Sequence, residues 1–263
     1  MEIRGSTVLL TGATGGIGQA IAHELASRGA ELILTGRKVE TLELLARDLG
    51  ARTEAADLSH REDVERLAAE AGAVDILVAN AALPGSGRLE TYTAEQIDRV
   101  LDVNLRAPMM LAHAMTRPMM DRGRGHLLFM SSLSGKAATA RASIYNATKF
   151  GLRGFALALR ADLRPHGVGV SVVCPGFIRD AGLFAKSGAS TPPGIATRSP
   201  QDVARAVAGA IEHNRGEVDV APLTLRLGSA FSGLAPGVAA TATRVTGADR
   251  LADQVAEGQR PLR

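Results

Sequence analysis

A phenol and an amine that could do proton chemistry lie four residues apart in this sequence, as Tyr145 and Lys149. On a helix, this spacing places both side chains on one face. A neighbouring cation favours the phenolate and lowers the pKa of a tyrosine from its usual value near ~10. A tyrosine adjusted in this way can exchange a proton with an alcohol or carbonyl oxygen. The pair alone is a weak signal, because the same spacing also occurs on solvated helix faces.

Two upstream residues make the pair more informative. Ser132 lies thirteen residues before Tyr145, just after the largely apolar run 126–130, which is typical of a buried strand. Ser131 and Ser134 are further candidates, and the spacing to Tyr145 favours Ser132. Asn104 lies inside a helical region predicted from about 93 to 122, where Asn is a poor helix former. It is either a harmless buried polar group or a functional one.

A glycine-rich turn near the start of the chain predicts a phosphate-binding site. Residues 11–18 read Thr-Gly-Ala-Thr-Gly-Gly-Ile-Gly, between a β-rich run and an amphipathic helical pattern. Glycines let the backbone turn tightly and approach a pyrophosphate, and the helix amino end offers free N–H groups. The order strand, glycine turn and helix therefore indicates a dinucleotide site.

Together these motifs resemble the short-chain dehydrogenase/reductase family, over roughly the first two thirds of the chain. The resemblance implies that Ser132 holds the substrate oxygen, that Tyr145 is the acid and base, and that Lys149 assists it. It also implies that Asn104 holds a water linking Lys149 to solvent. The cofactor-binding residues that it implies are Gly12, Thr14, Gly15, Gly16, Ile17, Gly18, Arg37, Asp57, Leu58, Asn80, Ala81, Tyr145, Lys149, Pro175, Gly176 and Ile178.

The residues after the second predicted strand, 32–35, bear on the choice of cofactor. An acidic residue at this point would bind the 2′-hydroxyl of NAD, whereas a cation suits the 2′-phosphate of NADP. Here Gly36 takes the acidic position, and Arg37 and Lys38 follow. We therefore favour NADP(H), with NAD(H) possible. The alternative is that both cations are ordinary solvated loop charges.

Two positions depart from the family pattern. Ala82 replaces the Gly of the family's Asn-Ala-Gly, which removes freedom for positive φ at that turn. Asn80 is therefore expected mainly to brace the sheet. Asp180 stands where the family has a Thr that contacts the cofactor. Because a carboxylate is repelled by a pyrophosphate, Asp180 is expected to point away.

Strands alternate with helices along the chain, which predicts an α/β fold. We expect a Rossmann-like doubly wound parallel sheet with helices on both faces, as a single domain over 1–263. Residues 181–199, rich in Gly, Ser, Thr and Pro, are expected to form a substrate lid. Residues 222–263 form a C-terminal extension. Its apolar part, 222–245, could pack on the core or on another subunit, cover a lipophilic substrate or, less favoured, touch a membrane.

Composition narrows the function classes. Hydrophobic residues make up 46% of the chain, which suits a sizeable core, and Cys174 is the single cysteine. The net charge is +3 with no basic stripe interleaved with aromatics, so nucleic acid is not expected as a partner. No metal-ligand spacing, leader or long apolar segment stands out, so we expect no metal and a cytoplasmic location.

These observations predict an NADP(H)-dependent oxidoreductase that interconverts a carbonyl compound and a secondary alcohol. The loops expected around the substrate, 83–91, 133–144 and 181–199, are mostly small and apolar, which favours a lipophilic small molecule. The family resemblance implies a homodimer or homotetramer. The alternative is a non-catalytic nucleotide-binding or scaffold protein of the same fold.

Overall fold

The computed structural model describes residues 1–191, 195–235, 237 and 248–262. Parts of the expected lid (192–194) and of the C-terminal extension (236, 238–247 and 263) therefore lie outside the described residues. The elements in chain order are β1 (Thr7–Thr11), α1 (Gly16–Ser27), β2 (Glu31–Gly36), α2 (Val39–Leu49), β3 (Arg52–Ala55), α3 (Arg61–Ala71), β4 (Ile76–Ala79), η1 (Leu89–Thr91), α4 (Ala94–Leu101), η2 (Asp102–Arg106), α5 (Ala107–Asp121), β5 (Gly125–Met130), η3 (Leu133–Gly135), α6 (Ser143–Leu163), η4 (Arg164–His166), β6 (Val168–Pro175), α7 (Gly182–Lys186), α8 (Pro200–Glu212), β7 (Glu217–Val220), α9 (Leu223–Leu234), α11 (Ala248–Gln259) and η5 (Arg260–Leu262).

The strands form one parallel sheet in the order β3-β2-β1-β4-β5-β6-β7. β4, β5 and β6 are buried along their whole length, as expected for strands covered on both faces. The chain winds outward from β1 in one direction as far as β3, and then returns to β4 on the other side of β1. This reversal opens a crevice at the carboxyl ends of β1 and β4, where ligands bind in such folds.

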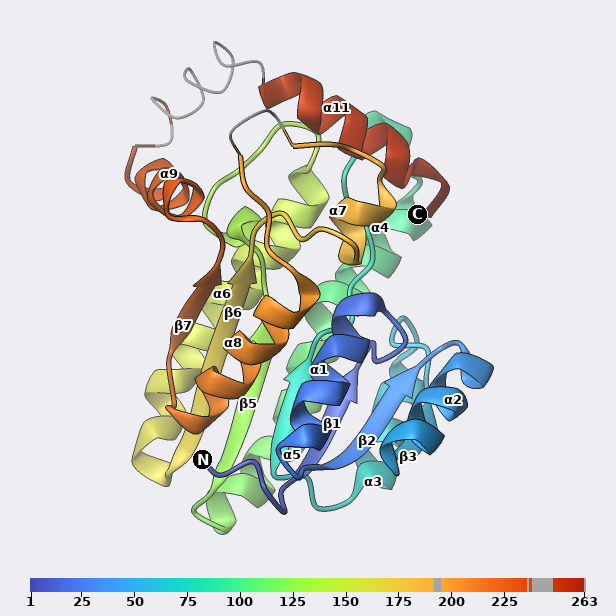
Figure 1. Ribbon diagram of the computed structural model, residues 1–263, viewed down its shortest axis with the longest axis vertical. Helices are drawn as coiled ribbons and strands as arrows, with labels where there is room; N and C mark the ends of the chain where they lie inside the picture. Colours follow the sequence, from blue (N-terminus) through green and yellow to red (C-terminus); the bar gives the residue numbers. More distant parts are fainter. Residues whose placement is uncertain (192–194, 236, 238–247, 263) are drawn as a thin grey trace.

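Helices cover both faces of the sheet, which confirms the predicted Rossmann-like arrangement (Figure 1). One apolar core joins the sheet to α1, α2 and α8, with Ile21, Leu42 and Val207 among its buried members. The other joins the opposite face to α3, α5 and α6, with Leu67 and Leu152 among its members. Both cores are mainly aliphatic, as the low aromatic content predicts.

The helical region expected at 93–122 is interrupted in the middle. α4 begins with a capping box between Thr93 and Gln96, and the chain then makes a π-helical turn, η2, before α5. A π-turn inserts one residue into the helical repeat and often marks a functional site. Asn104 lies at its centre and is almost completely buried.

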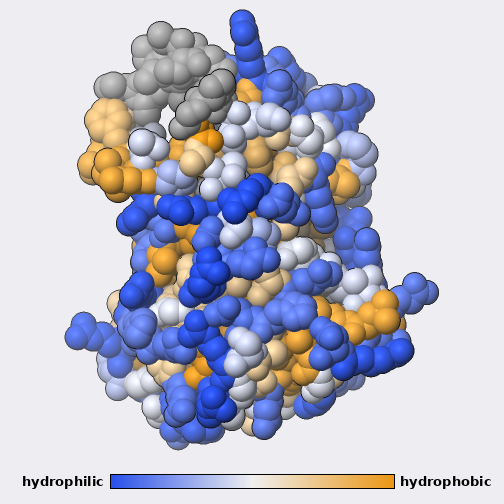
Figure 2. All heavy atoms as spheres, viewed as in Figure 1, coloured by the Kyte–Doolittle hydropathy of each residue, from blue (hydrophilic) through white to orange (hydrophobic). Residues whose placement is uncertain are grey.

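Above the carboxyl ends of the strands, α7, α9 and α11 form an upper layer (Figure 1). The later part of the expected C-terminal extension forms helix α11, which packs against α7. On α9, Leu223, Leu227 and Phe231 are exposed at helical spacing, and Figure 2 shows hydrophobic atoms gathered over this helix. Among the described residues, we find no helix long and apolar enough to cross a membrane.

Candidate active site

A cavity of ≈ 790 Å³ opens at the carboxyl ends of the strands. All the residues predicted to be catalytic or cofactor-binding line it, with the exception of Asn104. They arrive from the β1–α1 turn, the ends of β2, β4, β5 and β6, the segment after β3 and helix α6. Because the strands are parallel, their carboxyl ends share one edge of the sheet, and this brings together residues far apart in the sequence.

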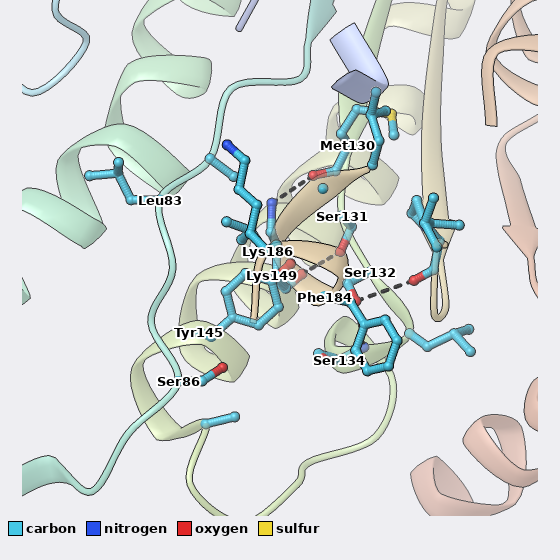
Figure 3. A pocket seen from close by; sticks show the side chains of 18 of the residues that line it. Leu83, Ser86, Met130, Ser131, Ser132, Ser134, Tyr145, Lys149, Phe184 and Lys186 are labelled. Carbon is cyan, nitrogen blue, oxygen red and sulfur yellow. Dashed lines mark hydrogen bonds between the residues drawn. The ribbon is translucent and has the colours of Figure 1, made fainter. Parts of the chain in front are cut away.

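Ser132, Tyr145 and Lys149 lie together at one end of this cavity (Figure 3). Tyr145 and Lys149 project from the same side of α6, with Lys149 Nζ 5.6 Å from the centre of the tyrosine ring. Lys149 Nζ donates to the carbonyl of Met130 at 2.8 Å. Ser132 Oγ donates to the carbonyl of Pro175 at 3.3 Å and accepts from the backbone N–H of Ser134 at 3.1 Å. The serine hydroxyl is thereby anchored to β6 beside the phenol.

The pKa values of this cluster differ from the prediction. Burial raises the pKa of Tyr145 to about 12, and a hydrogen bond with Ser132 counteracts only part of that rise. Burial also lowers the pKa of Lys149 to about 8. The expectation that the ammonium lowers the tyrosine pKa towards neutrality is therefore wrong for this structure. Loss of hydration is the larger effect for Tyr145, and the Lys149 ammonium donates to the carbonyl of Met130.

Asn104 lies behind the cavity wall and does not line it. Its Oδ1 accepts from the N–H of Leu83 at 2.7 Å, and its Nδ2 donates to the carbonyl of Leu83 at 2.9 Å. Both ends of the amide are thus used to brace the segment that follows β4.

The β1–α1 turn fits a pyrophosphate. Gly15 is the N-cap of α1 with no side-chain capping bond, so the first N–H groups of the helix are left for a ligand. Gly12 has φ 68°, and a Cβ added at Gly18 would lie 2.2 Å from the carbonyl oxygen of Gly12. A side chain at Gly16 would meet Ala181 at 2.7 Å. The absence of side chains at these glycines lets the turn pack closely on itself and on Ala181, the residue before α7.

Arg37, predicted to lie at the adenosine site, lines another part of the cavity. A Cβ added at Gly36 would lie 3.1 Å from the side chain of Thr14, so Thr14 leaves little room for a larger residue at this position. Arg37 is 49% exposed and lies 3.7 Å from Asp57. Burial favours a higher pKa for Asp57, but hydrogen bonds from Ser59 and the charges of Arg37 and Arg99 together hold its pKa below the usual value. Asp57 is therefore ionised and orients the guanidinium at the cavity edge.

The two departures from the family pattern behave as expected. Asn80 donates to the carbonyls of Thr11 and Gly12 at 3.0 and 3.3 Å, which ties β4 to the start of the glycine turn. Ala82 is not among the described residues with positive φ, so its turn does not require glycine. Asp180 points away, since its side chain is 74% exposed and pairs with Arg179.

The cavity wall extends beyond the predicted site residues. α7, inside the segment expected to form a substrate lid, contributes Phe184 and Lys186, both of which Figure 3 shows beside Ser132, Tyr145 and Lys149. α11 contributes residues at helical spacing that the sequence analysis missed: Leu251, Ala252, Val255 and Gln259. Their spacing is a recognisable sign of an amphipathic helix, but it contains no information on where that helix docks.

Comparisons with known proteins agree with this geometry. Residues 6–191 match the sequence profile of short chain dehydrogenases. The chain is 33% identical over 227 residues to the ketoacyl reductase HetN of a Nostoc species, covering 83% of this chain and 79% of the relative. A short-chain dehydrogenase from Sphingobium yanoikuyae, solved in complex with NADPH, superposes with a TM-score of 0.77 at 30% identity, over 89% of this chain and 94% of that one.

A metagenomic short-chain oxidoreductase in complex with NADP gives a TM-score of 0.69 at 35% identity, over 84% of this chain and 98% of that one. The matching profile spans more than half of the chain, and it contains the glycine cradle, Ser132, Tyr145 and Lys149. Fold, site geometry and sequence similarity therefore agree, and the non-catalytic alternative is not supported. The chain belongs to the short-chain dehydrogenase/reductase family of oxidoreductases.

Proposed function

We propose that this protein interconverts a carbonyl compound and a secondary alcohol with NADP(H), using Tyr145 as acid and base. The observation that carries the proposal is the meeting of the Tyr145 phenol, the Ser132 hydroxyl and the Lys149 ammonium at the end of a cavity that begins at the glycine cradle. A substrate oxygen placed at this cluster would have two hydroxyl groups within reach.

Each residue has a distinct task in this proposal. When bound, the nicotinamide supplies or accepts the hydride. Tyr145 donates a proton to the substrate oxygen in reduction and takes it back in oxidation. Ser132 holds the same oxygen by a hydrogen bond, with its hydroxyl kept in place by Pro175 and Ser134. Lys149 holds the nicotinamide ribose and favours the phenolate as it forms.

The protonation states support catalysis in the reducing direction. With a pKa of about 12, Tyr145 carries its proton at neutral pH and is ready to donate it. With a pKa of about 8, Lys149 is mostly charged at the same pH and can stabilise the phenolate that the donation leaves. Asn104 supports the return of a proton through the backbone of the π-turn.

Arg37 supports a preference for NADP(H). It is the cation directly after β2, and no acidic side chain stands at Gly36 to receive a 2′-hydroxyl. The solved relatives that contain NADPH and NADP have the same fold. NAD(H) is the second choice. Asp57 pairs with Arg37 and so reduces the positive charge that Arg37 offers to a 2′-phosphate.

The substrate side of the cavity supports a lipophilic substrate. Apolar side chains from three separate elements line it: Phe184 of α7, Leu225 and Phe231 of α9, and Leu251 and Val255 of α11. The extension thus acts as a cover over the substrate, and the segment around α7 as a lid. The relative named as a ketoacyl reductase has a name in keeping with carbonyl chemistry of this kind.

We place subunit pairing on the outer face of α6. Phe150 and Leu157 are exposed there seven residues apart, two turns along one face. This face supports a homodimer or a homotetramer. The exposed apolar residues of α9 form a second face, for which contact with a membrane surface is the less favoured use.

The replacement of Tyr145 by Phe tests the proposed function, because it removes one oxygen atom and keeps the ring. We expect kcat for ketone reduction with NADPH to fall by roughly 10²- to 10⁴-fold, the usual contribution of a general acid. NADPH affinity, followed by nucleotide fluorescence, should stay within about twofold of wild type, since the glycine cradle is untouched. Turnover at the wild-type rate in Tyr145→Phe would refute the proposal.

A further inference from the structure

Four charged side chains from three elements meet beside the turn that carries Ser132. Lys136, the residue directly after η3, donates to Asp219 at 2.6 Å and also pairs with Glu217. Arg153 of α6 donates to the other carboxylate oxygen of Glu217. The Lys136 and Asp219 side chains are only 11% and 14% exposed, so this ion pair is largely withdrawn from water.

The position of this cluster relates it to the reacting groups. Lys136 lies four residues after Ser132, and Arg153 lies four residues, about one helical turn, after Lys149. Asp219 lies opposite Cys174 in the β6–β7 pairing, and the next residue of β6 is Pro175, whose carbonyl accepts from Ser132. The two carboxylates of β7 therefore connect the serine turn to the helix that carries Tyr145 and Lys149.

The serine turn is held from two sides. On the α6 side, Asn146 donates to the carbonyl of Ser134 at 2.7 Å, and Ser131 donates to the carbonyl of Lys149 at 2.9 Å. On the β7 side, the ion pairs of Lys136 hold the residue at which the turn ends. With both attachments, the turn cannot rotate without breaking hydrogen bonds on one side or the other.

The energetics of the cluster favour a fixed arrangement. Burial disfavours the charged form of Lys136, but hydrogen bonds to Asp219 and Glu217 outweigh this effect and raise its pKa above the usual value. Removal of one member leaves a partner charge with poor hydration, which is costly in a largely buried place. A pair of apolar side chains could fill this space. It would lack the directional hydrogen bonds that hold the serine turn at one position on β7.

We propose that Lys136 is a positioning residue, whose ion pairs with Asp219 and Glu217 hold the Ser132 hydroxyl at the place beside Tyr145 that the reaction requires. This inference rests on the proposed function, because it assumes that Ser132 and Tyr145 act on one substrate oxygen. Lys136 acts through Ser132, and it is not among the residues that line the cavity.

The test compares Lys136→Met, Lys136→Arg and Asp219→Asn with a control variant. In Lys136→Met and Asp219→Asn, we expect kcat for ketone reduction to fall by about 10- to 100-fold, the effect of a misplacement near ~1 Å. The Kd for NADPH should stay within about twofold, since the glycine cradle is unaffected. Lys136→Arg keeps the charge and should recover most of the lost kcat, which a loss of packing alone does not explain.

Glu212→Gln is the matched control. It weakens an ion pair of 2.7 Å between Arg28, the residue directly after α1, and Glu212 of α8, partly buried and away from the cavity. We expect it to lower the urea midpoint of unfolding by an amount similar to Asp219→Asn while leaving kcat unchanged. Asp219→Asn preserves the shape of the side chain, so it keeps the inference testable if Lys136→Met does not fold.

Three results would overturn the inference: wild-type kcat in folded Lys136→Met or Asp219→Asn, equal losses of kcat in Glu212→Gln, or no recovery in Lys136→Arg. The behaviour of Tyr145→Phe separates these failures from a failure of the proposed function. If Tyr145→Phe is inactive while Lys136→Met turns over normally, the positioning role alone is wrong. If Tyr145→Phe is active, the proposed function itself is wrong.

Discussion

Burial moves the pKa values of Tyr145 and Lys149 in opposite directions, to about 12 and about 8. Both shifts favour the neutral form of the group, because an apolar wall solvates a charge poorly. At neutral pH Tyr145 therefore keeps its proton. Lys149 is mostly protonated at neutral pH and loses its proton slightly above it. During reduction, a substrate oxygen beside Tyr145 would develop negative charge, which favours transfer of the phenol proton to that oxygen.

At the residue scale, replacement of Arg37 by Ala tests the choice of cofactor. The guanidinium is half exposed and shared with Asp57, so its contribution to binding a 2′-phosphate lies at the lower end for a charged hydrogen bond. We expect the Kd for NADPH to rise roughly tenfold and the Kd for NADH to change little, since NADH lacks the phosphate. Fluorescence titration with each nucleotide measures both values.

Arg47→Ala is a suitable control for this prediction. Arg47 lies in the last turn of α2, is strongly exposed, pairs with Glu43 four residues earlier and is not among the residues that line the cavity. Its loss removes the same positive charge from the protein and should leave both Kd values unchanged. Equal weakening of NADPH and NADH in Arg37→Ala would mean that Arg37 supports the pocket and does not read the phosphate.

At the element scale, the docking of α11 decides how the substrate side of the cavity is closed. Gln259 donates to the carbonyl of Leu183 at 3.2 Å, and Asp253 pairs with Arg141 at 2.7 Å. Gly258 lies directly against α7, since a Cβ there would be 1.8 Å from the carbonyl oxygen of Ser187. α11 is therefore joined to both the lid segment and the loop before α6.

Replacement of Gly258 by Ala should displace α11 although alanine favours helices. The added methyl cannot fit against Ser187, whereas at Gly209 of α8 a Cβ would meet nothing within 4 Å. We expect Gly209→Ala to raise the free energy of unfolding by about 0.5–1 kcal/mol through helix propensity. Gly258→Ala should instead speed hydrogen exchange in peptides from 248–262. Unchanged exchange in these peptides would show that α11 does not dock through Gly258.

At the scale of the whole molecule, stability should depend on a histidine inside the sheet. His126 of β5 is buried, and its Nε2 lies 2.8 Å from Ser171 Oγ of β6. Ser171 donates to the carbonyl of Arg215 at 2.6 Å, so its oxygen can accept from an Nε2–H of a neutral imidazole. Burial, with a smaller effect of Arg160, lowers the pKa of His126 to about 3.

The sign of the resulting pH dependence follows from linkage. Between pH ~6.5 and pH ~3, the unfolded chain protonates His126 and the folded protein does not, so stability falls as the pH falls. The loss approaches roughly 1.4 kcal/mol per pH unit well below the unfolded pKa. We expect urea unfolding at pH 7 and pH 5 to show a smaller difference in His126→Gln than in the wild type.

His23→Gln is the control, because it makes the same substitution at a histidine whose side chain is 54% exposed. Carboxylates titrate in the same range in all three proteins, so only the difference between variants reports on His126. The same pH dependence in His126→Gln and in the wild type would contradict the assignment.

The sequence by itself determined the features that depend on short-range pattern. The alternation of strands and helices, the glycine cradle before α1 and the shared face of Tyr145 and Lys149 all follow from local spacing and residue type. Once the strands are parallel, their carboxyl ends must meet, so the site residues come together without further information.

Only the tertiary structure decided features that depend on contacts between distant segments. The pKa of Tyr145 depends on how completely packing removes water, and spacing to Lys149 does not report that. Asn104 lies in the π-turn, and its side chain hydrogen-bonds to the backbone of Leu83, twenty-one residues earlier. The pairing of Lys136 with Asp219 joins residues 83 positions apart, and the pairing of Arg141 with Asp253 of α11 joins residues 112 positions apart. Such contacts produce no periodic pattern in the sequence, because each one joins two distant segments at a single point that only the tertiary fold brings together.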